Sequence, residues 1–103
     1  SVAGGVRVEE PSCDLAVALA VVSSFYDRPL PHNLAAFGEL GLTGEVRRVG
    51  GGLKRWQEIK RYGYTQAVLP GDMLEEIGGE QIKVIGVNTV REMLRIMFKM
   101  KGE

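Results

Sequence analysis

Residues 64–98, YTQAVLPGDMLEEIGGEQIKVIGVNTVREMLRIMF, contain the alternation of elements that decides the fold. Residues 64–69 and 82–87 are each predicted to form a strand, and the first strand ends at the turn-forming pair Pro70-Gly71. Residues 73–77 fit a short helical turn between them. A capping box, Thr89-Val90-Arg91-Glu92, predicts that a final helix begins there. The apolar positions of that helix are Val90, Met93, Leu94, Met97 and Phe98.

The N-terminal part of the chain supplies a further strand and a helix. Residues 4–9 alternate apolar and polar side chains, as a half-buried strand does. Residues 15–25 are almost entirely apolar but too few for a membrane span, which predicts a helix buried on most sides. Ser12 or Asp14 is expected to cap the first free amides of this helix.

The central part of the chain predicts two strands followed by a second helix. Residues 34–42 and 45–49 are the strands, with a turn or bulge at residues 41–44. Residues 53–62 have helical spacing of apolar side chains, and Gly63 occupies the position of a C-terminal cap glycine. The spaced apolar residues are Leu53, Trp56 and Ile59. Strands that alternate with helices predict one α/β (α+β) layer structure.

Length and composition exclude several classes of protein. The 103 residues fit one domain, residues 1–103, and 13 basic residues balance 13 acidic ones. This balance excludes a wholly basic histone-like binder and an acidic disordered tail. No apolar run approaches the ~18 residues of a membrane span, and the N-terminus lacks a signal-peptide pattern. We therefore expect a cytoplasmic protein with no membrane partner.

The count of cysteine and histidine limits the metal chemistry. Cys13 is the single cysteine, which excludes an internal disulfide and a four-cysteine zinc site. His32 is the single histidine, and it lies in a proline-rich loop where a surface position is expected. We expect no metal site and no cofactor in this segment.

Residues 47–61 are the most distinctive chemical feature, with six basic residues and one acid, Glu58. A glycine run at residues 50–52 precedes the predicted helix, but its spacing is not that of a P-loop. A DNA phosphate backbone suits such a segment, with Trp56 and Tyr62 nearby for contact. The alternative is a solvated helix face whose charges pair with distant acids. The expected DNA-binding residues are Arg47, Arg48, Lys54, Arg55, Lys60 and Arg61.

A serine and a lysine form a second candidate site. A serine nucleophile can be activated by a neutral lysine, provided that the lysine is desolvated. Ser12 and Lys54 could play these roles, and Arg55 would push Lys54 toward its neutral form. Spacing alone does not establish such a pair, and the simpler role for Ser12 is a helix cap.

Several stretches together resemble the C-terminal domain of the bacterial DNA-repair family RadA, also called Sms. They begin with GGVRV at residues 4–8, DLAVALA at 14–20 and SSFYDRPLP at 23–31. FGELGLTGEVR at residues 37–47 and the YGY of residues 62–64, followed by Pro70, continue the resemblance. It covers nearly the whole chain.

The resemblance implies the fold of the Lon protease catalytic domain, a mixed sheet packed with about three to four helices. It further implies a C-terminal fragment of a longer ATPase, whose zinc finger and RecA-like motor would hold zinc, ATP and magnesium. Such a motor is implied to aid homologous recombination by branch migration. Its Lon-like domain is implied to support ring assembly with other copies and DNA binding, without proteolysis. The DNA partner would be single-stranded or branched.

The same resemblance bears on the serine and the lysine. Pro11-Ser12 is similar to the Lon nucleophile, and GGLK at residues 51–54 is similar to the stretch that carries the Lon lysine. Cys13-Asp14 replaces small residues and places an anion near the oxyanion position. Phe37 replaces a threonine, and an ungapped alignment places Leu53 at the lysine position.

Three hypotheses follow from these observations. The first is a non-catalytic assembly and DNA-binding domain. The second is a Lon-type peptidase that uses Ser12 and Lys54. The third is a structural module that packs against neighbouring subunits.

Overall fold

The computed structural model describes residues 2–3, 6–7, 10–78 and 81–100. The helices are α1 (Asp14–Phe25), α2 (Gly52–Arg61) and α3 (Val90–Phe98), with short 3-10 helices η1 (Pro11–Cys13) and η2 (Gly71–Met73). The strands are β1 (Val2–Ala3), β2 (Val6–Arg7), β3 (Leu34–Ala36), β4 (Glu39–Leu40), β5 (Val46–Arg47), β6 (Gln66–Pro70) and β7 (Lys83–Val87). The α/β class and the three predicted helices are therefore confirmed.

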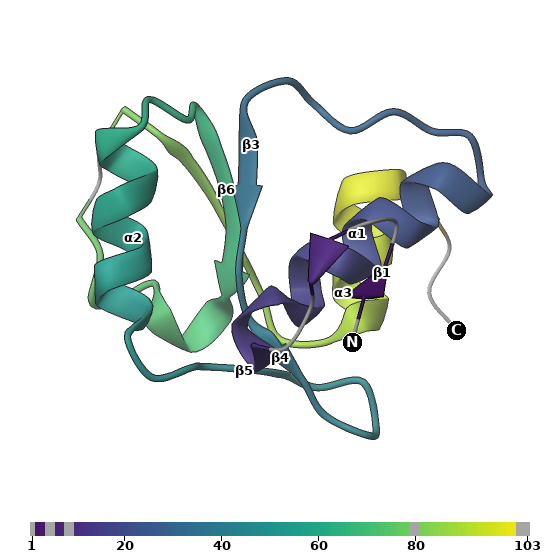
Figure 1. Ribbon diagram of the computed structural model, residues 1–103, viewed down its shortest axis with the longest axis horizontal. Coiled ribbons are helices and arrows are strands. Elements are labelled where there is room, and N and C mark those ends of the chain that lie inside the picture. The colour runs from purple at the N-terminus through teal and green to yellow at the C-terminus, as the bar shows by residue number, and fades with distance from the viewer. Residues whose placement is uncertain (1, 4–5, 8–9, 79–80, 101–103) are drawn as a thin grey trace.

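The central sheet has three parallel strands in the order β3-β6-β7. Val68 of β6 lies opposite Ala36 on one side and Ile85 on the other. The sheet separates α2 from the pair α1 and α3, so the molecule has three layers (Figure 1). A parallel strand with helices on both faces is buried on both faces, which accounts for the continuous apolar sequence of β6.

Alternate residues of the sheet belong to two separate cores. Val68 and Val87 pack with Leu15, Leu19 and Met93 of α1 and α3. On the opposite face, side chains of β6 and η2 pack with α2. The buried members of this second core are Phe37, Trp56, Ile59, Ala67, Leu69 and Met73. Side chains of successive strand residues point to opposite faces, so one strand supplies both cores.

The predicted strand at residues 34–42 is two strands in two different sheets. The N–H of Phe37 still donates to the carbonyl of Val68, but Gly38 has a φ of 151° and turns the chain away. β4 then pairs with β5 in an antiparallel hairpin, in which Leu40 lies opposite Val46. A glycine is needed at residue 38 because L side chains rarely adopt this φ.

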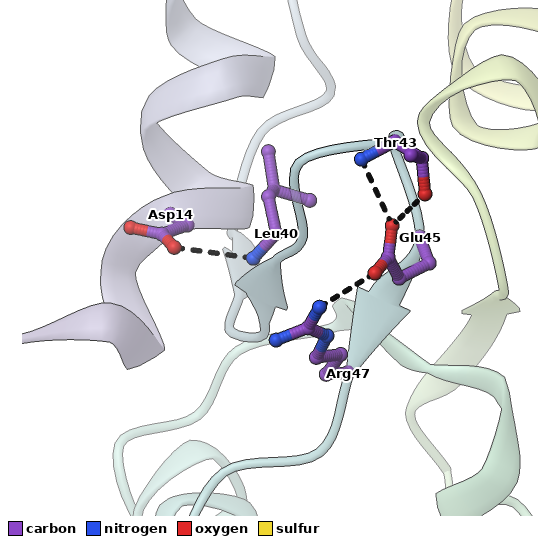
Figure 2. Close-up of polar contacts among 5 residues, drawn as sticks. All are labelled: Asp14, Leu40, Thr43, Glu45 and Arg47. Atoms are coloured by element: carbon purple, nitrogen blue, oxygen red, sulfur yellow. Dashed lines mark hydrogen bonds and ion pairs between the residues drawn. The ribbon is translucent and has the colours of Figure 1, made fainter.

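The structure also corrects two expectations about α1. Its N-cap residue is Cys13, which makes no side-chain cap, so neither Ser12 nor Asp14 plays the predicted capping role. Asp14 instead accepts a hydrogen bond from the N–H of Leu40 at 3.1 Å, which ties α1 to the hairpin (Figure 2). The helix is not buried on most sides, because only Leu15 and Leu19 of its residues are buried, and Val21 and Phe25 are 59% and 79% exposed.

The capping box predicted at the start of α3 is confirmed. Thr89 caps the helix by accepting from the N–H of Glu92 at 3.0 Å. The Glu92 carboxylate in turn accepts from the N–H of Asn88 at 2.7 Å, one residue before the position that a standard capping box uses.

The remaining elements follow the sequence with small shifts. Gly63 has a φ of 80° after α2, as a C-terminal cap glycine does. The helical turn expected at residues 73–77 is displaced toward the N-terminus, because the 3-10 helix η2 spans Gly71–Met73 and shares only residue 73 with it. The strand expected at residues 4–9 overlaps β2, but residues 4, 5, 8 and 9 lie outside the described part.

Among the residues that the structure describes, no helix has both the length and the apolar character needed to cross a membrane.

Candidate nucleic-acid interface

The glycine run before α2 has a packing role as well as a conformational one. Gly51 is the N-cap residue with a φ of 77°, and no side chain caps the helix. Gly52 is buried, and a Cβ there would lie 3.0 Å from the sulfur of Met73. Gly52 therefore allows α2 to begin close against η2, where a larger residue would require the Met73 side chain to shift.

One face of α2 packs on the sheet, and the other carries charge. Trp56 and Ile59 are buried in the core against β6, so Trp56 is not available for the nucleic-acid contact expected from the sequence. Leu53, expected on the apolar face, is 47% exposed. Lys54 lies on the exposed face. Tyr62, which follows the helix, is 68% exposed and remains accessible.

Among the residues that the structure describes, Arg47, Arg48 and Arg55 form ion pairs with acids of the fold. Arg47 contacts Glu45 at 2.6 Å, Arg48 contacts Glu76 through two hydrogen bonds, and Arg55 contacts Glu10. The partners lie 2, 28 and 45 residues away in sequence. The alternative of a helix face whose charges pair with distant acids therefore holds for Arg55, the one of these three arginines that lies on α2.

The ion pair between Arg48 and Glu76 favours the charged form of both side chains. The side-chain hydrogen bond with Glu76 raises the pKa of Arg48, and the same bond lowers the pKa of Glu76. Arg48 is therefore engaged within the fold and is less available to an external phosphate.

The other three basic residues lie on α2. Lys60 lies 5.8 Å from the ring centroid of Trp56, and the guanidinium of Arg61 lies 5.5 Å from that of Tyr62. Within the part of the chain that the structure describes, Lys54 and Arg61 form no ion pair. Both are exposed. Lys54 and Arg61 are thus the cations of this segment most accessible to an external phosphate.

Ser12 lies in a hollow with Arg55 and Glu10 and not with Lys54. Its side chain is buried, and its hydroxyl donates to Oε2 of Glu10 at 3.1 Å, the same oxygen that Arg55 contacts. Arg48 also lines this hollow. Lys54 lines a different hollow, at the start of α2. The pairing of Ser12 with Lys54 stays a prediction.

The β4–β5 hairpin is held by the carboxylate of Glu45. It accepts hydrogen bonds from the hydroxyl and the N–H of Thr43 at 2.5 and 3.1 Å, and from Arg47 at 2.6 Å (Figure 2). The bond from the Thr43 hydroxyl, followed by that from Arg47, lowers the pKa of Glu45 from 4.5 to about 2. Arg47 is therefore engaged by Glu45 within the hairpin and is less available to an external phosphate.

The lowered pKa of Glu45 predicts a pH dependence with a defined sign. Because the folded state favours the ionised carboxylate, its contribution to stability is complete above pH 4.5 and is lost as the pH falls toward 2. An NMR titration of the side-chain carboxyl should give a midpoint near 2. Thr43→Val should raise this midpoint more than Arg47→Ala does, since the Thr43 bond is the larger cause. A wild-type midpoint near 4.5 would contradict this account.

The other candidate residues lie apart from this region. His32 is exposed, as expected, and Cys13 is half-buried beside α1. Within the described ranges, no group of three or more His, Cys, Asp or Glu side chains is placed to hold a metal ion.

A comparison with known protein families shows the family to which the chain belongs. Residues 2–73 match the family described as Subunit ChlI of Mg-chelatase, and the chain belongs to this family. Within the curated proteins, it is similar to several named DNA repair protein RadA. It is 42% identical to that of Escherichia coli K12 over 93% of this chain, and 42% identical to that of Aquifex aeolicus over 95%. It is 44% identical to the RadA of Streptococcus pneumoniae over 93%.

These alignments confirm the likeness to RadA proteins that the sequence motifs predicted. They cover 21%, 22% and 23% of the three relatives, so the chain spans less than a quarter of their length. The activity of a whole RadA protein can therefore only be proposed for this chain.

Proposed function

We propose that this chain is a Lon protease-like domain of a RadA-type DNA-repair protein, and that it binds DNA and supports assembly without proteolysis. The identity of 42–44% to proteins named DNA repair protein RadA, over more than nine-tenths of the chain, supports this assignment. The observation that carries the DNA-binding part is the exposed pair Lys54 and Arg61 on α2, which form no ion pair with any described residue.

The proposed contact with DNA is electrostatic. Lys54 and Arg61 contact phosphates directly, and Lys60 adds charge beside them. The arginines at residues 47, 48 and 55 contribute less, because each must leave or share the carboxylate that it already contacts. Phosphate contacts fix the position of a protein on DNA but carry no sequence information, so binding should be insensitive to base order.

The same proposal includes the activity and the assembly of the parent protein. The parent protein is a cytoplasmic ATPase that aids homologous recombination by branch migration, with ATP, magnesium and zinc bound by segments outside these 103 residues. Copies of the parent assemble into a ring, which multiplies weak DNA contacts through effective concentration. A single domain is then expected to bind DNA weakly on its own.

The contacts of Ser12 favour this proposal over a peptidase. A lysine general base must lose its proton, which burial promotes, yet Lys54 is exposed. The Ser12 hydroxyl is already engaged as a donor to Glu10. A serine-directed acylating probe should therefore leave the folded chain unlabelled at Ser12.

The salt dependence of binding tests the proposal. Fluorescence anisotropy with a labelled 20-nucleotide single strand should show affinity that falls linearly on a log–log scale with salt, by about 0.7 per phosphate contacted. Two to three contacts predict a slope of about −1.4 to −2.1. The absence of binding at 50 mM salt, with the chain folded and at millimolar concentration, would overturn the DNA-binding role.

A further inference from the structure

A shallow hollow lies between α2 and the edge of the sheet, at the end of the basic face. It is lined by Ile59, Tyr62 and Tyr64, by Arg55 and Glu58, and by residues 35–37 at the edge of the sheet. Both tyrosines are accessible, at 68% and 40% exposure. The hollow therefore offers aromatic rings to a ligand that comes from solvent.

The size of the hollow limits what can enter it. Its volume is about 240 Å³, below the roughly 300–1,000 Å³ of sites that enclose a whole drug-sized ligand. One flat group fits such a space better than a complete free ligand. The rest of the ligand must then lie outside, along the surface of α2.

The cations near the hollow indicate the chemistry of the part of the ligand that lies outside it. Arg61 lies 5.5 Å from the ring centroid of Tyr62, and Lys54 is exposed on the same helix. A chain of phosphates would meet these cations while one of its bases occupies the hollow. A polymer that combines anionic groups with flat aromatic groups is a single-stranded nucleic acid.

The polar groups at the hollow match the edge of a base. Arg55 has guanidinium N–H groups to donate beyond its contact with Glu10, and the Glu58 carboxylate can accept. Exposed bases present both acceptors and amino donors along their edges. The hollow thus provides one group of each kind beside two aromatic rings.

From this combination we propose that the hollow lined by Tyr62 and Tyr64 is a stacking site for one base of a single-stranded nucleic acid. This inference rests on the proposed function, because it assumes that the basic face of α2 holds the phosphates. It adds a second mode of contact that responds to bases and not to charge. Duplex DNA, whose bases are already stacked and paired, cannot use it.

The decisive experiment separates bases from phosphates. Two labelled 20-nucleotide single strands are compared by anisotropy, one with normal bases and one with abasic positions throughout, so that both carry equal charge. The wild-type chain should bind the base-bearing strand on the order of 10-fold or more tightly than the abasic one. The double variant Tyr62→Ala with Tyr64→Ala should lose this difference.

A matched control removes two exposed aromatic rings elsewhere. Phe25 and Tyr26, at the end of α1, are 79% and 47% exposed, and α1 lies on the other side of the sheet from α2 (Figure 1). The control variant Phe25→Ala with Tyr26→Ala should keep the preference for the base-bearing strand. Circular dichroism establishes that each variant is folded before binding is compared.

The outcomes of this experiment distinguish the stacking site from the phosphate contacts on which it rests. Equal, salt-sensitive binding of both strands by the wild type would overturn the stacking site and leave the phosphate contacts standing. Binding of neither strand would overturn both. An equal loss of preference in the tyrosine variant and in the control would also overturn the site, since the effect would not belong to the hollow.

Discussion

Replacing Leu69 by alanine should lower the free energy of unfolding by about 2–5 kcal/mol, because it removes a fully buried side chain from the core beneath α2. Leu69 belongs to β6, the central strand, and its side chain packs in the same core as Trp56 and Ile59 of α2. A domain of this size is stable by about 5–15 kcal/mol, so the decrease is a large share of the total. Urea unfolding followed by circular dichroism measures it.

The chain offers a matched control for this change. Leu42 lies at the tip of the β4–β5 hairpin and is 103% exposed, so Leu42→Ala should change the free energy of unfolding by less than about 0.5 kcal/mol. If Leu69→Ala does not fold, Leu69→Met keeps most of the volume and should cost less than about 1.5 kcal/mol. Equal small effects at residues 69 and 42 would contradict the three-layer packing.

Reversing the charges of Lys54 and Arg61 should produce the largest effect on DNA binding. The double variant Lys54→Glu with Arg61→Glu can no longer hold two of the phosphates, which should weaken binding to a single strand on the order of 10-fold or more at 0.1 M salt. The salt dependence should become shallower by about 1.4, that is, by 0.7 for each of these two phosphates. Anisotropy with the same labelled strand measures both quantities.

A second double variant controls for the change in net charge. Arg91 on α3 and Lys99 directly after it are exposed cations, and α3 lies on the other side of the sheet from α2 (Figure 1). Arg91→Glu with Lys99→Glu changes the net charge by the same amount, so a general electrostatic effect would act equally in both variants. We expect the control to keep nearly the wild-type slope. An identical weakening in both variants would mean that binding is not localised on α2.

Regular elements with strong local signals could be predicted from the sequence. The glycines and the apolar spacing around α2 indicate nearly its observed limits, and the capping residues Thr89 and Glu92 mark the start of α3. These features depend on interactions within one or two turns of the same helix. They are visible without knowledge of the rest of the chain.

The features that the sequence does not reveal depend on distant parts of the chain. Gly38 divides an apolar run because its φ takes the backbone out of the sheet, and neighbouring residues give no sign of this. The ion pair between Arg55 and Glu10 joins residues 45 positions apart. The sequence pattern indicates only that Tyr64 begins a strand, and its place beside Tyr62 in the hollow requires the fold.

Mapping the DNA-bound surface tests directly whether α2 and the tyrosines after it contact single-stranded DNA. Backbone amide signals in ¹H–¹⁵N NMR spectra can be followed while a short unlabelled single strand is added. Our account predicts that the shifted signals cluster at residues 53–64 and that those of α3 stay in place. Shifts confined to α1 or α3, or no shifts at a saturating concentration of DNA, would contradict it.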